Sequence, residues 1–230
     1  MGARRSGELG QSQLHSQPGN CPGSVRRRLK MAGSCQHVLM TTEALLVMDM
    51  QNGVVDRFGE QATSLLVTLA DTMAAARTAK RHVIFVRVAF RRGTPEVNPK
   101  NVVFSAYAGT DALGEMEHTT QIHPALAPQP GEIVLTKKRV SAFSGSDLDV
   151  VLRSLGIESL VLTGIATSGV VLSTLREAAD LDFILTVLSD GCLDGDSEVH
   201  RILMEKVFPR QASVVSAAEW RAQISATTKG

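Results

Sequence analysis

The sequence predicts an α/β fold, in which a single doubly wound, mostly parallel sheet of six strands carries helices on both faces. Three observations lead to this fold class. Apolar runs of strand length alternate with segments of helical periodicity from about residue 41 onward. The connections between runs are too long for β-hairpins. Hydrophobic residues make up 43% of the chain but aromatic residues only 4%, so aliphatic side chains must build the core, as they do in buried parallel sheets.

The first half of the domain begins with a continuous apolar run at 44–50 that ends close to an acid, which predicts a strand buried on both faces. Apolar residues then recur every three or four positions over 60–80, which predicts a helix. Residues 82–88 predict a second buried strand. Residues 90–130 are rich in Gly, Pro, Asn and Thr, and so long an irregular stretch favours a lid or substrate loop. Within it, only 110–116 suggests a short helix.

In the second half, strands and helices alternate regularly, and Gly156 and Pro209 stop two of the helices. The predicted strands are 132–136, 160–163, 183–189 and 212–215, and the predicted helices are 146–155, 168–180, 196–207 and 217–224. This order is typical of a three-layer, Rossmann-like domain. In such sheets ligands bind beyond the carboxyl ends of the strands, so the residues that follow each strand are the candidates for function.

Charge separates the chain into a tail, 1–40, and a domain, 41–230. The tail holds six basic residues and one acid, which leaves 18 basic and 22 acidic residues in the domain. The tail is rich in Gly, Ser, Gln and Arg without apolar periodicity, which predicts disorder. Its Arg- and Ser-rich, acid-poor composition also fits an organellar transit peptide, and this alternative stays open.

Composition also limits the partners. The domain has no clustered basic stretch, which argues against a nucleic-acid partner. No run approaches 18 apolar residues, which argues against a membrane span. Three scattered cysteines, Cys21, Cys35 and Cys192, do not make a disulfide framework, and they favour a reducing, cytoplasmic location.

Two strand ends carry ionisable residues. Asp49 ends the first apolar run, where a buried carboxyl group with a shifted pKa could act as a general acid or base. It could equally be a solvated loop acid. Lys137 follows the third run and could point into the same crevice, where its ammonium would hold the Asp49 carboxylate. A solvent-facing lysine is the alternative.

The fourth strand runs into a glycine-rich turn, 164–171, that opens a helix. Gly164 and Gly169 have the spacing of a phosphate loop, but Val170 and Val171 stand where that loop needs Lys and Ser or Thr. We therefore reject nucleotide binding. A strand, turn and helix in this order still present backbone N–H groups, which form a natural anion or oxyanion site.

Three motifs now point to a family: Leu46-Val-Met-Asp-Met-Gln-Asn52, Lys137-x-x-x-Ser-Ala-Phe143 and Gly164-Ile-Ala-Thr-x-x-x-Val-x-x-Thr174. Over residues 43–216 the chain resembles the isochorismatase-like (cysteine hydrolase) superfamily. The resemblance implies a triad of an acid, a lysine and a cysteine. Asp49 and Lys137 match the first two, and Val170 stands at the position of the cysteine.

The resemblance also implies a non-proline cis peptide between Ile165 and Ala166. It implies further substrate-binding or oxyanion residues, which are Gln51, Phe143, Ile165, Ala166, Thr167, Ser168 and Gly169. Nicotinamidase relatives bind a metal through an acid and two closely spaced histidines. His82, His118, His123 and His200 lack that spacing, so we predict no metal. No organic cofactor is implied. A homo-oligomer is implied, with Met116, Trp220 and segment 90–130 as candidate interface parts.

Without the cysteine, an acyl-enzyme is not expected at position 170. Isochorismatase-type relatives cleave a vinyl ether without a thiol: an acid protonates the vinyl carbon and water attacks. We therefore expect a hydrolase of a small, carboxylated or amide-bearing metabolite, with Asp49 as acid or base and Lys137 as its partner. Lys137, Arg87, Arg91 or Arg92 would hold substrate carboxylates.

Three alternatives to this reading stay open. Cys192 follows the fifth predicted strand and could replace the missing nucleophile, although a free cysteine is more often simply buried. Ser168 is a nearby hydroxyl without an evident histidine base. The chain could also be a pseudoenzyme that is retained as a metabolite-binding or regulatory module.

Overall fold

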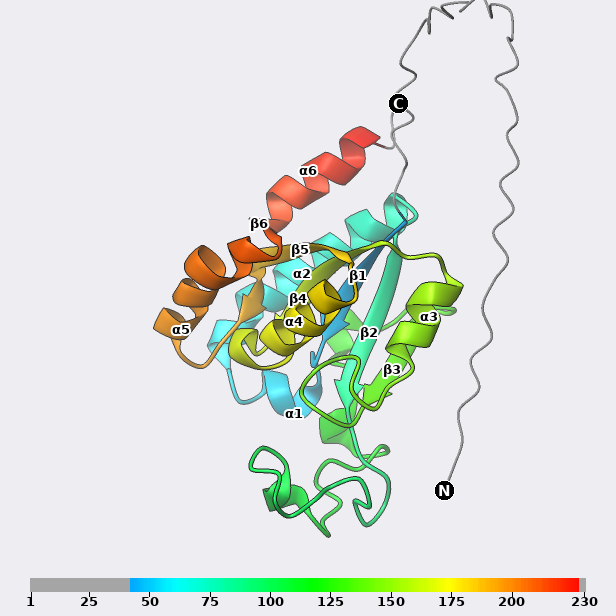
Figure 1. Ribbon diagram of the computed structural model, residues 1–230, viewed down its shortest axis with the longest axis vertical. Coiled ribbons are helices and arrows are strands. Elements are labelled where there is room, and N and C mark those ends of the chain that lie inside the picture. Colours follow the sequence, from blue (N-terminus) through cyan, green and yellow to red (C-terminus); the bar gives the residue numbers. More distant parts are fainter. Residues whose placement is uncertain (1–41, 228–230) are drawn as a thin grey trace, which may run out of the picture. The chain divides into compact units, whose positions relative to one another are not determined.

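A six-stranded sheet with parallel neighbours throughout forms the centre of the domain (Figure 1). The computed structural model describes residues 42–227, so the predicted tail, 1–40, lies outside the described residues. The strand order is β3-β2-β1-β4-β5-β6. The strands are β1 Glu43–Met48, β2 His82–Val88, β3 Ile133–Lys137, β4 Ser159–Ile165, β5 Ile184–Leu193 and β6 Ser213–Val215. The predicted fold class is confirmed.

Helices cover both faces of the sheet. They are α1 Asn52–Val55, α2 Glu60–Thr78, α3 Leu148–Ser154, α4 Leu172–Asp180, α5 Ser197–Ile202 and α6 Ala217–Thr227. Buried residues of α3, α4 and the turn after α5 pack on one face, and those of α1, α2 and α6 pack on the other. None of the helices within 42–227 combines the length and the apolar character needed to cross a bilayer.

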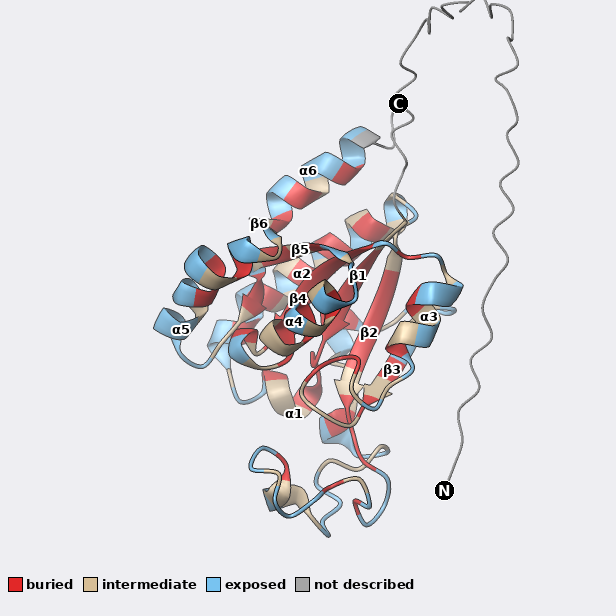
Figure 2. Cartoon of the chain, in the orientation of Figure 1, coloured by how far each residue is buried: buried red, intermediate tan, exposed pale blue. Residues whose placement is uncertain are grey.

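The sequence of β1 explains why it lies at the centre. Ala44, Leu46 and Met48 pack on the face covered by α3 and α4, whereas Leu45 and Val47 pack on the face covered by α2 and α6. Successive side chains of a strand point to opposite faces, so a continuous apolar run suits a strand that is covered on both sides. Figure 2 shows β1 and β2 buried along most of their length.

The chain direction changes at this central strand. From β1 the chain continues to β2 and β3 on one side, and it then returns to β4 on the other side. The carboxyl ends of β1 and β4 are therefore neighbours at a topological switch point, where open α/β sheets bind ligands. Segment 90–130 leaves β2 at the same edge, and its contacts cover that edge.

Several predicted boundaries differ from the structure. β1 ends at Met48 rather than at residue 50, because Asp49 has a left-handed backbone with φ 55°. The predicted helix at 110–116 is wrong. Residues there form turns, and Gly114 pairs with Phe90 in an isolated parallel bridge. The short helix α1 was not predicted, and Lys137 belongs to β3 rather than following it.

Two predicted helices contain wider π-helical turns. The predicted helix at 168–180 is a π-helical turn, Thr167–Val171, followed by α4. The predicted helix at 196–207 is α5 followed by a second such turn, Leu203–Val207. β5 extends to Leu193, beyond the predicted end at 189, so that Cys192 is part of the strand.

Trp220, which was predicted as an interface residue, is buried by its own chain and cannot contact a second subunit. Only 2% of it is exposed, and it packs with residues of α2 in the core. Ala217 and Ile224 of α6 are buried in the same cluster, so the aromatic ring helps to hold this helix on the sheet. Met116, by contrast, is 91% exposed. The predicted homo-oligomer, with Met116 and segment 90–130 at its interface, stays a prediction.

We expect Gly164→Ala to destabilise the domain by about 3 kcal/mol. Gly164 has φ 131°, and an added Cβ would run into the backbone carbonyl of Met48 on the neighbouring strand. Denaturant unfolding followed by circular dichroism measures the effect. Gly195→Ala is the matched control, because a Cβ at Gly195 meets no atom within 4 Å. A cost below about 1 kcal/mol for Gly164→Ala would contradict the close approach of β1 and β4.

Candidate active site

Asp49 is placed by the end of β1. Its backbone N–H donates a hydrogen bond of 2.8 Å to the Val86 carbonyl of β2, and its positive φ then turns the chain away from the sheet. The residue is only 8% exposed. The strand thus delivers a carboxyl group into a nearly dry position at the switch point.

Lys137 is the last residue of β3 and is 1% exposed. Its Nζ lies 2.8 Å from Asp49 Oδ2 and donates a second hydrogen bond of 2.6 Å to the Val140 carbonyl. β1 and β3 are not neighbours, because β2 lies between them. The long lysine side chain therefore reaches past the end of β2 to meet the acid, and the predicted contact between the two head groups is present.

The second carboxyl oxygen of Asp49 has no hydrogen-bond partner, although it is buried. Buried polar atoms are nearly always paired, so an unpaired one calls for an explanation. Burial raises the pKa of the Asp49 carboxyl above its ordinary value of 3.8, and the Lys137 ammonium opposes that rise only in part. The site therefore holds a carboxyl group whose proton is kept to higher pH and which has one oxygen free for a ligand or water.

The turn after β4 lies beside Asp49. The peptide between Ile165 and Ala166 is cis, as predicted. The Ala166 carbonyl then accepts hydrogen bonds from the N–H groups of Gly169 and Val171, which closes the π-helical turn. Val170 is buried within this turn. The strand carrying the turn is tied to β1 by Thr163, whose hydroxyl donates 2.7 Å to the Leu46 carbonyl.

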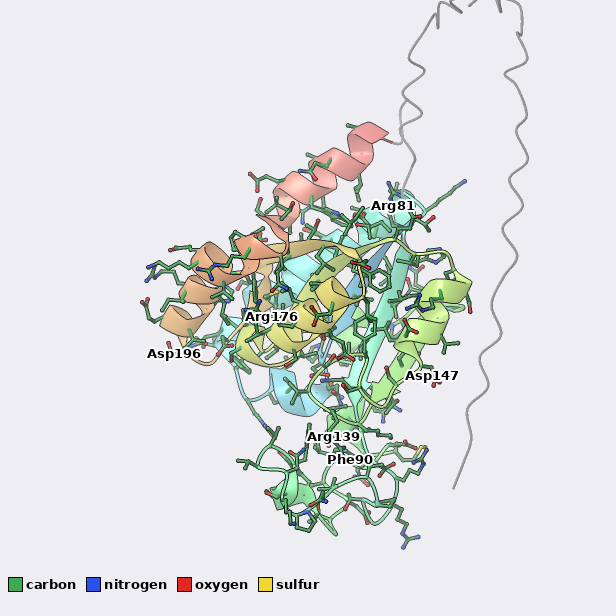
Figure 3. The ribbon with its side chains drawn as sticks, in the orientation of Figure 1. Arg81, Phe90, Arg139, Asp147, Arg176 and Asp196 are labelled. Atoms are coloured by element: carbon green, nitrogen blue, oxygen red, sulfur yellow. The ribbon has the colours of Figure 1, made fainter. Side chains whose placement is uncertain are left out.

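The segment after β5 holds this turn in two places, and sequence reasoning missed both. The Thr167 hydroxyl lies 2.8 Å from His200 Nδ1, and the Ser168 N–H donates 2.6 Å to Asp194 Oδ2. Asp196, labelled in Figure 3, caps α5 by accepting from two backbone N–H groups, which fixes the helix that carries His200. Thr167 is buried, whereas Ser168 is exposed.

The Gln51 side chain joins the end of β1 to the backbone of β2 and of segment 90–130. Its amide nitrogen donates 2.9 Å to both the Val88 and Thr120 carbonyls, and its amide oxygen accepts from the Val88 N–H. Asn52 donates 2.9 Å to the His118 carbonyl. Both amide N–H groups of Gln51 are thus used by the backbone, so the side chain ties segment 90–130 to the sheet rather than offering a donor to a substrate.

Phe143 lies in the core rather than at the carboxyl edge. Its ring packs 6.2 Å from that of Phe183, the residue before β5, and it belongs to the cluster under α3 and α4. We therefore correct its predicted role as a substrate contact, since its ring faces the helices. The neighbouring Ala142 N–H donates 2.9 Å to the Thr174 hydroxyl, which joins the loop after β3 to α4.

Two of the three arginines that were predicted to hold a substrate carboxylate have other partners, and the third lies in an acidic hollow. Arg87 donates to the Thr136 hydroxyl and the Gln121 side chain. Arg91 is largely exposed and pairs with Glu96 at 2.8 Å. Arg92 is exposed and lines a hollow that also contains Asp111, Glu115 and Glu117. Phe90, labelled in Figure 3, lines the same hollow. Arg87 and Arg91 are thus bonded to groups other than Asp49.

Cys192 does not replace the missing nucleophile. It lies within β5 opposite Gly164 of β4, it is buried, and its Sγ is 3.8 Å from the Leu162 carbonyl. Burial raises the pKa of the Cys192 thiol above its ordinary range, which disfavours the reactive thiolate. Cys192 is a packed core residue.

The four histidines considered for a metal do not gather. Within residues 42–227, no three His, Cys, Asp or Glu side chains come close enough together to hold an ion. His118 lies beside Asn52, His123 Nδ1 accepts from the Ala125 N–H, and His200 contacts Thr167. The expectation that the protein needs no metal and no organic cofactor stays a prediction.

Comparison with known proteins assigns the class of this fold and site. The isochorismatase domain family matches residues 43–219. The chain therefore belongs to the isochorismatase family of hydrolases, as its motifs suggested.

Individual relatives agree with this membership. Ureidoacrylate amidohydrolase RutB of Variovorax paradoxus (strain S110) is 36% identical over 169 residues, which cover 64% of this chain and 67% of that protein. YecD, an uncharacterized isochorismatase family protein of Escherichia coli O157:H7, is 33% identical over 180 residues, covering 77% and 94%. A solved isochorismatase family protein from Burkholderia thailandensis superimposes with a TM-score of 0.71 at 31% identity, covering 80% and 96%.

The raised pKa of Asp49 predicts a pH-dependent stability difference between the wild type and Asp49→Asn. In the folded protein Asp49 keeps its proton above pH 3.8, where the unfolded chain has released it. The stability that this group contributes is therefore complete below pH 3.8 and is lost as pH rises through the folded pKa. Relative to the wild type, Asp49→Asn should gain about 1.4 kcal/mol per pH unit within that window.

Urea unfolding at a series of pH values measures this difference. Asp71→Asn, the same substitution at an exposed position of α2, is the control. A difference that is flat with pH, or of opposite slope, would mean that Asp49 is an ordinary carboxylate dominated by Lys137.

Proposed function

We propose that this chain hydrolyses a small, carboxylated or amide-bearing metabolite with water as the attacking group, Asp49 as the acid or base and Lys137 as its partner. The observation that carries the proposal is the buried Asp49–Lys137 pair with one carboxyl oxygen left unpaired. Such a pair is not needed to fold a sheet, and buried ion pairs often cost stability. Its retention at the switch point supports a chemical role.

The acid role suits a vinyl ether. Protonated Asp49 gives its proton to the terminal vinyl carbon, which leaves a positive, oxocarbenium-like carbon. The oxygen of water bonds to that carbon and returns a proton to Asp49, which gives a hemiketal. Asp49 then passes this proton to the ether oxygen as the C–O bond to the leaving alcohol breaks, and it takes up the proton of the hemiketal hydroxyl as that group becomes a carbonyl. Lys137 stabilises the Asp49 carboxylate that exists between proton transfers. The raised pKa supports this role, because it keeps the acid protonated over a wider pH range.

The base role suits an amide. Ionised Asp49 takes a proton from water as the water oxygen bonds to the carbonyl carbon. The C–N bond then breaks, and the proton passes to the leaving nitrogen. The likeness to ureidoacrylate amidohydrolase supports an amide-bearing substrate. Val170 argues for water, since an aliphatic side chain at the predicted cysteine position offers no atom for an acyl intermediate.

We expect Asp49→Asn to lower kcat/KM by about 100-fold or more, because the amide cannot exchange the proton. Turnover of a panel of small vinyl ethers, amides and carbamoyl compounds measures this, with Asp71→Asn as the control. The pH profile distinguishes the two roles. An acid loses activity as pH rises through the Asp49 pKa, whereas a base gains it. Unchanged turnover in Asp49→Asn would disprove the proposed chemistry.

Val170→Cys tests whether position 170 is the nucleophile position. In a background with Cys21 and Cys35 replaced by Ser, Val170→Cys should gain amide hydrolysis and form an acyl adduct that intact mass spectrometry detects. Val171→Cys, the same change one residue further along the turn, should form none. If the two variants behave alike, Val170 does not stand at the position of the family cysteine.

A metabolite-binding or regulatory pseudoenzyme is the second candidate, and Val170 is the observation that favours it. If the chain is a pseudoenzyme, the wild-type protein should turn over no compound of the panel. At least one compound should still bind and raise its melting temperature. Turnover that depends on Asp49 would exclude it.

A further inference from the structure

A cavity lies between α1 and segment 90–130, close to the end of β1. It has a volume of about 230 Å³, below the range of about 300–1,000 Å³ that drug-sized ligands need. The lining residues are Gln51, Gly53, Val54, Arg57, Tyr107, Ala112, Leu113 and Thr119. Gln51 follows Asp49 by two positions and so connects this cavity to the candidate active site.

The cavity is held open by fixed contacts. A Cβ at Gly53 would lie 2.9 Å from Thr119 Cβ, so α1 and the turn around residue 119 already approach as closely as a glycine allows. Gln51 and Asn52 bond to the backbone of the same segment. Both walls are therefore attached to the end of β1, and the space between them does not depend on a free loop.

Arg57 is the one charged residue in the lining. Its guanidinium donates 3.2 Å to the hydroxyl of Tyr107, which is a neutral partner. The described ion pairs do not include Arg57, and the cavity lining contains no acid. A guanidinium has five N–H donors in a fixed plane, so donors remain for an anion. Because the Tyr107 oxygen accepts from Arg57, its own proton is free to be donated to the same anion.

The other hollow at this edge has the opposite character. It measures about 290 Å³, and beside Arg92 it is lined by Asp111, Glu115 and Glu117. These carboxylates compete for the arginine and would repel an organic acid. Together with the internal bonds of Arg87 and the Arg91–Glu96 pair, this leaves Arg57 as the cation best placed to bind a carboxylate.

We propose that this cavity binds the carboxylate end of a small organic acid, with Arg57 and Tyr107 holding the carboxylate and Val54 and Leu113 contacting a short apolar body. That this acid is the substrate rests on the function proposed above. Arg57 is then a specificity residue for carboxylated substrates and takes no part in proton transfer.

Binding of benzoate, with benzamide as its neutral analogue, tests the cavity without turnover. Benzoate should bind the wild type more tightly than benzamide does, and Arg57→Met should weaken benzoate binding about tenfold while leaving benzamide binding unchanged. Titration followed by NMR measures both affinities. Arg210→Met, which removes an exposed arginine elsewhere, is the matched control. Tyr107→Phe should weaken benzoate binding by a smaller factor.

Equal benzoate affinity in the wild type and Arg57→Met would overturn the proposal, and so would an equal loss for benzamide. Kinetics separate this proposal from the proposed function. Arg57→Met should raise KM for carboxylated substrates with kcat nearly unchanged, whereas Asp49→Asn should lower kcat. Benzoate binding that depends on Arg57 in a protein without turnover would support the cavity and reject the hydrolase. Turnover that depends on Asp49 but not on Arg57 would support the hydrolase and reject the role of Arg57 in substrate binding.

Discussion

The carboxyl edge of this protein depends on one contact, the ion pair between Asp49 and Lys137. Two charges taken out of water lose solvation, and their attraction repays that loss only when the geometry is good and the remaining donors are bonded. The fold meets that condition from several directions. β1 ends in a left-handed residue that turns the carboxyl group inward, and Lys137 reaches past β2 while the Val140 carbonyl holds its ammonium. The two partners come from strands that do not touch, so the pair also requires the register of the three strands β1, β2 and β3.

Val170 stands at the position that the sequence resemblance assigns to a nucleophilic cysteine, and in the proposed function this changes what the acid has to do. In a site with a thiolate, a carboxylate and a lysine would serve to activate the sulfur. Here Val170 is packed into a turn whose geometry is fixed by Ala166, by Thr167 with His200 and by Ser168 with Asp194. That support orders the backbone of the turn whatever side chain position 170 carries. The polar part of the site then reduces to the carboxyl group, its lysine and whatever the turn's backbone offers, which is sufficient to move a proton but not to form a covalent intermediate.

The sequence predicts those parts of the site that follow from local patterns, and it does not predict contacts between segments far apart in the chain. The fold class, Asp49, Lys137 and the turn at Gly164 were accessible, because apolar runs mark parallel strands and parallel strands gather their ends at one edge. The contact between Thr167 and His200 was not, since it joins two helices whose relative rotation no local pattern records. The same holds for Gln51, whose amide was expected to meet a substrate and instead bonds to the backbone of Val88 and Thr120. The role of Phe143 and the helix at 110–116 failed for a related reason, because packing in irregular segments depends on partners far away in sequence.

In the proposed reaction, which uses no nucleophilic side chain, substrate binding carries more of the catalysis. A covalent intermediate holds its substrate by a bond, whereas a reaction with water depends on non-covalent contacts to keep the substrate aligned with the acid. Arg57 and Tyr107 offer such a contact in the cavity proposed above, which Gln51, two residues from Asp49, also lines. Because Gln51 ties the end of β1 to segment 90–130, the anchor and the acid are parts of one rigid unit. In the proposed reaction, selectivity for the organic acid and efficiency of proton transfer would then depend on the same few hydrogen bonds at the end of β1.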